Sequence, residues 1–182
     1  IVTGGSRGIG RAIALMYAKE GADVLVNYHS NDAAAKDTVA EIEKLGRRGV
    51  AVAADVANYK SAQDMVEECV KQLGGVDIVV NNAGVSKPSM LLKMKEEDWD
   101  AIIDIHLKAA FNTTQAAGRH MKEQKSGKII NVISTAGIFG TIGQINYASA
   151  KAGIIGFTKS ASRELGRYGI NVNVICPGIT KT

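Results

Sequence analysis

Short runs of aliphatic residues alternate along this chain with longer segments in which apolar residues recur at helical spacing. The runs cover residues 1–3, 24–28, 49–54, 76–80, 128–133 and 170–175. The fourth run is mainly aliphatic, which is typical of a parallel strand that is buried on both faces of a sheet. Regular alternation of strands and helices predicts an α/β fold with a doubly wound parallel sheet and right-handed crossovers.

The segments between these runs are predicted to be helices. The first would carry Ile9, Ile13, Met16 and Tyr17 on one face and end at Gly21. The later helices are predicted over residues 31–45, 61–73, 96–122 and from 147 to 167, with Asn31 or Asp32 as the cap of the second. The long helix over 96–122 is expected to bury Trp99, Ile102, Ile103, His106, Ala110 and Phe111.

Length and charge limit the classes of protein that this chain can belong to. A chain of 182 residues, 46% of them hydrophobic, can bury one core, so we expect a single domain over residues 1–182. The net charge of +4 is spread along the sequence and gives no footprint for nucleic acid. The uncharged stretch 129–150 contains too many glycine, asparagine and serine residues for a membrane span, and no membrane contact is expected.

The cysteines and histidines favour neither a disulfide nor a metal site. Cys69 and Cys176 stand alone, and we expect them to be buried, reduced thiols of a cytoplasmic protein. The three histidines are not at ligand spacings from cysteines or carboxylates, so no metal site is predicted. The sequence begins inside an apolar run without methionine and stops after a Pro-Gly turn, so we expect both ends to be cut from a longer chain.

Polar or glycine-rich segments follow the ends of five predicted strands. They are Gly4–Gly10, Asp55, Asn81–Gly84, Ser134 and Pro177–Gly178. Any one of them could be an ordinary turn. Ligands of doubly wound sheets bind beyond the carboxyl ends of the strands, so the five together predict a binding site there. The first segment lies between a strand and a helix, which is the context that a phosphate-binding turn requires.

Ser134, Tyr147 and Lys151 are the candidate chemical groups. Tyr147 and Lys151 are four residues apart and would share one face of a helix. A phenol exchanges protons poorly at neutral pH unless a nearby cation stabilises its anion, and Lys151 supplies such a cation. Alone, such a pair is usually a surface tyrosine and a solvated lysine. The pair becomes a strong signal of a catalytic site only together with Ser134 and the glycine turn.

Taken together, the motifs resemble those of the short-chain dehydrogenase/reductase family over the whole chain. They are Thr3-Gly4-x-x-x-Gly8-x-Gly10, Asn82-Ala83-Gly84, Ser134, Tyr147-x-x-x-Lys151 and Pro177-Gly178-x-x-x-Thr182. The resemblance implies a Rossmann fold with strand order 3-2-1-4-5-6 and an oxidoreductase that uses a nicotinamide cofactor. It also implies that the last strand and the substrate-covering helices of the family lie beyond this chain.

The resemblance gives each chemical group a role. Tyr147 would pass a proton to the substrate carbonyl as hydride arrives, or remove it in the reverse reaction. Lys151 would hold the nicotinamide ribose and favour the Tyr147 phenolate, while Ser134 would hydrogen-bond the carbonyl oxygen. Ser134 could instead act as an acyl-forming nucleophile, but no activating base stands at a suitable position in the sequence.

The expected cofactor contacts follow from the same resemblance. The glycines of the first turn would let the backbone approach a pyrophosphate at the start of the first helix. Asp55 and Val56 would border the adenine, and Asn82–Gly84 would back the adenosine ribose. The full set is Gly4, Ser6, Arg7, Gly8, Ile9, Gly10, Tyr28, His29, Ser30, Asp55, Val56, Asn82, Ala83, Gly84, Tyr147, Lys151, Pro177, Gly178, Thr180 and Thr182.

The end of the second strand favours NADP(H) as the cofactor. An acid about 20 residues after the glycines would hold a ribose 2′-hydroxyl and repel a 2′-phosphate. The residues there are Asn27, Tyr28, His29 and Ser30, without a carboxylate. Arg7 can pair with a phosphate. Asp32 is the nearest acid, and we interpret it as a helix cap, so NAD(H) stays possible but less favoured.

One position departs from the family pattern. Most members carry an asparagine, part of a proton relay through water, where this chain has His106 in D-I-H-L-K. A histidine can donate and accept hydrogen bonds, so His106 could take the same place in the relay. It could equally be a buried core histidine without a catalytic part.

Two longer segments resemble particular branches of the family. The segments M-L-L-K-M-K-E-E-D-W-D and G-Q-I-N-Y-A-S-A-K-A-G look most like 3-oxoacyl-[acyl-carrier-protein] reductases of fatty acid synthesis. His106 with Q-A-A-G-R-H-M-K-E-Q also resembles the 3-hydroxyacyl-CoA dehydrogenases. Both resemblances imply a 3-oxo- or 3-hydroxyacyl thioester, small or carrier-bound, as the substrate, and sugar or simple ketone substrates stay open.

The resemblance also bears on assembly. The long helices from Glu96 and around Tyr147 pair between subunits in the family, which implies a homodimer or homotetramer. An alternative of another class is a non-catalytic nucleotide-binding module. The intact Ser134, Tyr147 and Lys151 argue against it, because a binding role does not need all three.

Overall fold

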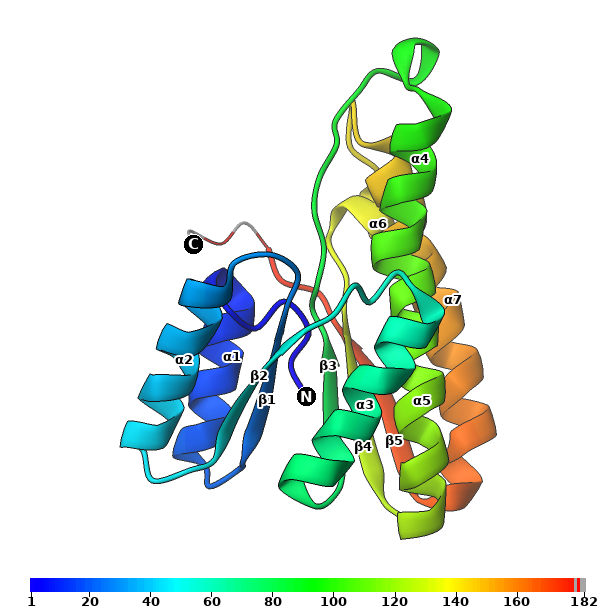
Figure 1. The fold of residues 1–182 in the computed structure, drawn as a ribbon. Coiled ribbons are helices and arrows are strands. Elements are labelled where there is room, and N and C mark those ends of the chain that lie inside the picture. Colours follow the sequence, from blue (N-terminus) through cyan, green and yellow to red (C-terminus); the bar gives the residue numbers. More distant parts are fainter. Residues whose placement is uncertain (179, 181–182) are drawn as a thin grey trace.

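The computed structural model describes residues 1–178 and 180, and its centre is a parallel β-sheet with helices on both faces (Figure 1). The strands are β1 (Val24–Tyr28), β2 (Gly49–Ala53), β3 (Ile78–Asn81), β4 (Gly127–Val132) and β5 (Ile170–Ile175). The α-helices are α1 (Gly8–Lys19), α2 (Asp32–Lys44), α3 (Tyr59–Leu73), α4 (Glu96–Ile103), α5 (Ala109–Gln124), α6 (Ala136–Phe139) and α7 (Ile145–Leu165). The 3₁₀ turns are η1 (Leu91–Lys93) and η3 (Gly166–Tyr168), and η2 (Asp104–Lys108) is π-helical.

The order of the strands confirms the predicted doubly wound sheet. β1 pairs with β2, β3 with β4, and β4 with β5, all in parallel. Val2 joins the two groups through single parallel bridges to Val26 of β1 and Val80 of β3. The segment predicted as the first strand therefore lies in the middle of the sheet, although it is reduced to this bridge. Counted with it, the strands follow the predicted order 3-2-1-4-5-6.

Alternate side chains of the strands fill two apolar layers, one on each face of the sheet. One layer joins Leu25, Val79 and Ile129 to α3, α5 and α7. The other joins Val26 and Val80 to α1 and α2. Figure 1 shows the same division, with α1 and α2 on one side of the sheet and α3, α5 and α7 on the other. The candidate site lies at the carboxyl ends of the strands, between these two layers.

The long helix predicted over 96–122 is interrupted. It starts at Glu96, but α4 ends at Ile103 and the π-helical η2 separates it from α5. The wider π turn shifts the faces of the helix before and after it, so one continuous buried row does not form. Trp99 and Phe111, predicted to be buried, are 37% and 42% exposed.

Two further expectations are wrong. Met16 was placed on one face of the first helix with Ile9, Ile13 and Tyr17, but it is 56% exposed whereas those three are half-buried, and the small residues Gly10, Ala14 and Ala18 are the buried ones. Cys176 is exposed just after β5, whereas Cys69 is buried and its thiol lies 3.5 Å from the Gly75 carbonyl oxygen. Neither cysteine forms a disulfide. Among the described residues no helix is long and apolar enough to cross a membrane.

Candidate active site

The glycine turn between residue 3 and α1 forms an open cradle. Gly4 and Gly8 have φ angles of +61° and +54°, which side chains other than glycine rarely adopt. A Cβ on Gly10 would lie 2.2 Å from the Gly4 carbonyl oxygen. Arg7 occupies the N-cap of α1 without a side-chain capping bond, and the first turn holds no acid. The free N–H groups at this positive helix end fit the pyrophosphate of a dinucleotide.

Thr3 ties this cradle to the Asn82-Ala83-Gly84 turn that follows β3. Its hydroxyl oxygen accepts hydrogen bonds from the backbone N–H groups of Asn82 and Ala83, each at 3.0 Å. The Asn82 amide in turn donates to the Thr3 carbonyl oxygen at 3.0 Å. Two segments far apart in sequence therefore form one rigid floor. Thr3 was not among the predicted site residues, although a threonine that ends an apolar strand and precedes a glycine turn is a readable signal.

The end of β1 presents Tyr28, His29 and Ser30, of which the last two are exposed. The Tyr28 hydroxyl donates to Asp32 at 2.7 Å, and Lys36 pairs with the same carboxylate at 2.7 Å. The hydrogen bond from Lys36, followed by that from Tyr28, lowers the pKa of Asp32. Of the two predicted caps of α2, Asn31 is the one observed: its side chain accepts the capping bond from the backbone N–H of residue 34, and Asp32 is the first residue of the helix.

Asp55 and Val56 follow β2 at the same edge of the sheet. Asp55 is exposed and accepts a hydrogen bond from the N–H of Ala57 at 3.0 Å, whereas Val56 is buried. The buried Asn112 of α5 donates to the carbonyl oxygens of Val56 and Ala57 at 2.9 and 3.2 Å. Asn112 therefore fixes the loop on which the predicted adenine contacts lie.

Tyr147 and Lys151 lie together on α7, beside the end of β4. The Lys151 side chain is 4% exposed, and its Nζ donates to the Val132 carbonyl oxygen at 2.6 Å. The same Nζ lies 5.5 Å from the centre of the Tyr147 ring. Burial lowers the pKa of Lys151 to about 8. A cation is thus held against a phenol in a largely desolvated place, where its charge acts strongly.

Ser134 lies two residues beyond Val132, at the end of the same strand. Its Oγ accepts a hydrogen bond from the N–H of Ala136 at 3.2 Å, which leaves the hydroxyl hydrogen free to donate. The short helix α6 that follows packs on α7 so closely that a Cβ on Gly137 would lie 2.8 Å from Lys151. The structure therefore brings the segment after Ser134 against the helix that carries Tyr147 and Lys151.

His106 lies in the π-helical segment η2 and is 4% exposed. Its Nε2 is 2.8 Å from the Val85 carbonyl oxygen, and its ring meets the Tyr147 ring edge-on, with centroids 5.1 Å apart and an interplanar angle of 87°. Burial, followed by the charge of Lys151, lowers the pKa of His106 to about 4. The imidazole is therefore neutral at physiological pH.

The carbonyl of Val85 fixes the tautomer of this imidazole. A carbonyl oxygen can only accept, so Nε2 carries the hydrogen and Nδ1 is the acceptor. Within the described residues Nδ1 is buried without a hydrogen-bond partner. An unpaired buried acceptor costs about 1 to 3 kcal/mol.

His106 also lines a cavity of about 10 Å³ together with Lys151, Asn81 and Thr113. That volume is close to the space that one water molecule needs.

Asn146 precedes Tyr147 and was missed in the sequence. It is fully buried, and its amide donates to the carbonyl oxygens of Lys87 and Asp98 at 3.1 and 3.2 Å. Its side-chain oxygen accepts from the Tyr147 N–H at 2.8 Å. Asn146 thus joins the start of α7 to α4 and to the loop before α4. No periodicity marks it, since one asparagine at a helix start reads as a cap.

The segment after β5 completes the edge of the site. Pro177 is half-buried, Gly178 and Thr180 are exposed, and the Thr180 hydroxyl donates to the Gly178 carbonyl oxygen at 3.4 Å. Thr182, the last predicted contact, lies outside the described residues. No group of three or more metal-ligating side chains occurs in the part of the chain that the structure describes.

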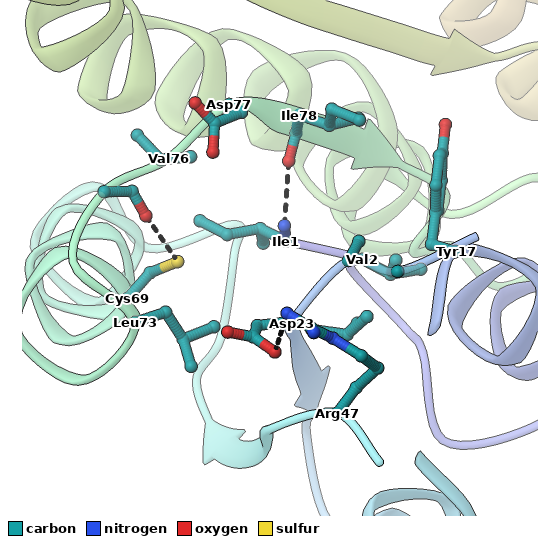
Figure 2. A pocket seen from close by; sticks show the side chains of 14 residues that line it. Ile1, Val2, Tyr17, Asp23, Arg47, Cys69, Leu73, Val76, Asp77 and Ile78 are labelled. Atoms are coloured by element: carbon teal, nitrogen blue, oxygen red, sulfur yellow. Dashed lines mark hydrogen bonds and ion pairs between the residues drawn. The ribbon is translucent and has the colours of Figure 1, made fainter. Parts of the chain in front are cut away.

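A larger cavity, of about 280 Å³, lies at the other edge of the sheet. Figure 2 shows it between Ile1, Asp23, Arg47, Cys69 and Asp77, which precede or flank the beginnings of the strands. None of the predicted site residues lines it. This cavity is therefore not part of the candidate site.

Comparison with known proteins identifies the family of this chain. The family model described as short chain dehydrogenase matches residues 1–182. The 3-oxoacyl-[acyl-carrier-protein] reductase FabG of Staphylococcus epidermidis (strain ATCC 12228) is 48% identical over 178 residues, which are 98% of this chain and 73% of the relative. The 3-oxoacyl-[acyl-carrier-protein] reductase of Synechocystis sp. is 46% identical over 182 residues, which are 100% of this chain and 74% of the relative.

Solved structures agree with the family match. A putative short-chain alcohol dehydrogenase from Sinorhizobium meliloti 1021 superimposes with a TM-score of 0.96 at 39% identity, covering 100% of this chain and 71% of the other. A short chain dehydrogenase from Mycobacterium avium gives a TM-score of 0.92 at 40% identity, covering 97% of this chain and 67% of the other.

Proposed function

Because this chain belongs to the short-chain dehydrogenase family, we propose that it reduces the keto group of a 3-oxoacyl thioester to the 3-hydroxyacyl thioester with NADPH. Family membership makes the chain an oxidoreductase. The finer assignment is supported by relatives that carry the name 3-oxoacyl-[acyl-carrier-protein] reductase. The observation that carries the mechanism is the buried Lys151 ammonium beside the Tyr147 ring.

The residues present fit a dinucleotide. The uncapped first turn of α1 would hold the pyrophosphate, and the Thr3-bound turn at Asn82–Gly84 would support the adenosine ribose. Lys151 uses one of its three donors on Val132, so the other two can reach the nicotinamide ribose. The nicotinamide supplies the hydride when it is bound.

The protein groups would then handle the proton and the oxygen. Tyr147 would donate its hydroxyl proton to the substrate oxygen, and the Lys151 charge would stabilise the phenolate that is left. Ser134 would donate its free hydroxyl hydrogen to the same oxygen, because its Oγ is already held by the N–H of Ala136. These two donors would fix the carbonyl against the nicotinamide face.

The preference for NADPH is supported by the surroundings of Asp32, the acid that follows the end of β1 most closely in the sequence. Asp32 is engaged by Tyr28 and Lys36 and so is less free to hold a ribose 2′-hydroxyl. Arg7 is exposed at the start of the cradle and could pair with a 2′-phosphate.

Exposed apolar side chains beside the site support an acyl substrate. Leu92 of η1 is 96% exposed, and Phe139 and Ile142, on the segment between Ser134 and Tyr147, are 82% and 88% exposed. The N–H of Ser89 donates to the Gly143 carbonyl oxygen at 2.8 Å and joins these segments. Apolar surface of this kind suits the hydrocarbon part of a thioester better than a sugar.

We further expect a homodimer or homotetramer built on α4, α5 and α7, in a cytoplasmic protein. Trp99 and Phe111 project from α4 and α5 and would be covered by a second subunit. Light scattering on the purified protein tests the assembly.

The assay that tests the function follows the oxidation of NADPH or NADH with acetoacetyl thioesters of acyl carrier protein and of coenzyme A. We expect turnover with NADPH, loss of turnover in Tyr147→Phe, and no effect of Tyr168→Phe, a matched change outside the site. Faster turnover with the coenzyme A thioester would favour a 3-hydroxyacyl-CoA dehydrogenase instead. Equal rates for Tyr147→Phe and the wild type would contradict the enzymatic mechanism.

A further inference from the structure

Three residues from three separate segments meet at the centre of the site. Gly84 follows β3, His106 lies in η2, and Tyr147 lies on α7, which runs alongside α4 and α5 (Figure 1). A Cβ added to Gly84 would lie 2.1 Å from Cε1 of His106, so the imidazole packs directly on the backbone of this turn. Its ring also meets the Tyr147 ring in an edge-to-face arrangement at 5.1 Å. The imidazole is thus enclosed between the turn and the phenol.

The hydrogen bond to Val85 prevents the imidazole from turning. Nε2 lies 2.8 Å from the Val85 carbonyl oxygen, which fixes the plane of the ring as well as its tautomer. Gly84 blocks one side of the ring, and Tyr147 occupies another. A side chain held in this way presents a fixed surface to its neighbour.

We propose that His106 is a positioning residue whose neutral ring fixes the rotamer of Tyr147, so that the phenol stays beside Lys151. This inference rests on the proposed function and adds to it a part for a residue that does not touch the substrate. The ring acts by contact, and no proton passes through it. The π turn of η2 is the local device that brings the ring to this place, as such turns often do at functional sites.

The charges around His106 agree with a neutral ring. Lys151 of α7 is the charged group that acts on the imidazole, and Tyr147 is the other titratable group that faces it. Asp104, on the same π segment, is engaged by Lys108 at the surface. An imidazolium at this position would repel the Lys151 ammonium, so protonation would oppose the arrangement that positions the phenol.

Two substitutions separate the ring from its hydrogen bond. His106→Gln keeps an amide donor near the position of Nε2, so the bond to Val85 can form, but it removes the ring. His106→Phe keeps a ring and removes the bond. If the ring positions Tyr147, we expect His106→Gln to lower kcat about three- to tenfold with an unchanged KM, which is the range for one aromatic pair. His106→Phe should recover part of that loss.

The pH profile separates positioning from proton transfer. A neutral residue that acts by contact leaves the limbs of the kcat profile where they are in the wild type. A wild-type kcat in His106→Gln would overturn the proposal and leave His106 as a core residue. A displaced limb in His106→Gln or His106→Phe would also overturn it, in favour of a proton relay.

A measurement without turnover keeps the test independent of the substrate. A crystal structure of the full-length His106→Gln protein should show the Tyr147 ring in more than one rotamer, while the wild type shows one. A single wild-type rotamer in His106→Gln would contradict the proposal, even if the variant is less stable or the true substrate is not a thioester. Failure of wild-type turnover with acetoacetyl thioesters would instead count against the proposed function alone.

Discussion

Lys151 donates a hydrogen bond to the carbonyl oxygen of Val132 at 2.6 Å, and this bond fixes the ammonium at the carboxyl end of β4. The side chain is buried, so its charge is held where solvent screens it little. The helix that carries Tyr147 is thereby joined to the strand that leads to Ser134. The predictions below follow from this junction and from the segments around it.

Replacing Lys151 should lower the catalytic rate without lowering the stability of the fold. We expect Lys151→Met to lower kcat about 100-fold or more, because the phenolate loses its counter-charge. The lowered pKa of Lys151, about 8, means that its buried charge destabilises the fold at pH 7, and the bond to Val132 offsets part of this. The urea midpoint of Lys151→Met should therefore equal or exceed that of the wild type. Lys159→Met, an exposed change on α7, is the control, and a clear fall in the Lys151→Met midpoint would contradict the prediction.

Acid should destabilise the protein through His106. Its pKa in the folded state is about 4, below the ordinary value of 6.5, so the unfolded chain binds the proton more readily. Stability from this group is complete above pH 6.5 and is lost as the pH falls toward 4. Between pH 7 and 5 the loss is about 2 kcal/mol. Urea unfolding at both pH values should show a smaller loss for His106→Gln, and the same loss in both proteins would rule out His106 as the cause.

Removing the Asn146 amide should weaken the start of α7. Asn146→Ala leaves the carbonyl oxygens of Lys87 and Asp98 and the N–H of Tyr147 without their partner. We expect a loss of about 2 to 3 kcal/mol in the free energy of unfolding and a lower kcat, because Tyr147 follows directly. Asn171→Ala, an exposed change on β5, should do neither. Equal urea midpoints for the two variants would show that the amide is dispensable.

Gly10→Ala should damage the cofactor cradle. The added Cβ would lie 2.2 Å from the Gly4 carbonyl oxygen and 2.6 Å from the Asn82 amide, so the glycine turn must move. We expect about 1 to 3 kcal/mol of destabilisation and at least about tenfold weaker NADPH binding by fluorescence titration. Gly166→Ala meets nothing within 4 Å and should be neutral or slightly stabilising. Wild-type NADPH affinity in Gly10→Ala would refute the assignment of the cradle.

An acid at the end of β1 should change the cofactor preference. His29→Asp would repel a 2′-phosphate and could hold a 2′-hydroxyl, so kcat/KM with NADPH should fall about tenfold or more while that with NADH is maintained. Asp32→Asn should change the ratio little, because Asp32 is paired with Lys36. A wild type that already prefers NADH would contradict the proposed cofactor.

Elements with a strong repeat could be read from the sequence, and so could the edge of the sheet that carries the candidate site. The apolar strands and the glycine stops predicted a parallel sheet, because burial on both faces leaves little freedom in composition, whereas the strand order came from the family resemblance. The interruption at η2 was not predicted, since a π turn depends on tertiary packing and leaves no periodic mark. Trp99 and Phe111, which lie before and after this segment, were wrongly expected to be buried.

Residues that act through backbone groups were the hardest to predict. Thr3 and Asn146 owe their importance to N–H and carbonyl groups that come near only after folding. Asp32 was misread as a cap because Asn31 and Asp32 have the same capping preference. The structure distinguishes them: the Tyr28 hydroxyl donates a hydrogen bond to the Asp32 carboxylate, and the Asn31 side chain accepts the capping bond.

The cavity beside Lys151 is lined by Asn81, one of a pair of amides in the middle of the sheet. Asn81 of β3 and Asn131 of β4 are register partners, joined by a hydrogen bond of 2.8 Å, and Asn131 reaches on to Thr158 of α7 at 2.8 Å. If β3 slipped by one residue along β4, Asn81 would face Ile130 or Val132 and would lose its amide partner inside the core. Aliphatic side chains alone would tolerate such a slip far better. The hydrogen bond between these amides therefore specifies one register of β3 against β4, and this register fixes where the ends of both strands lie.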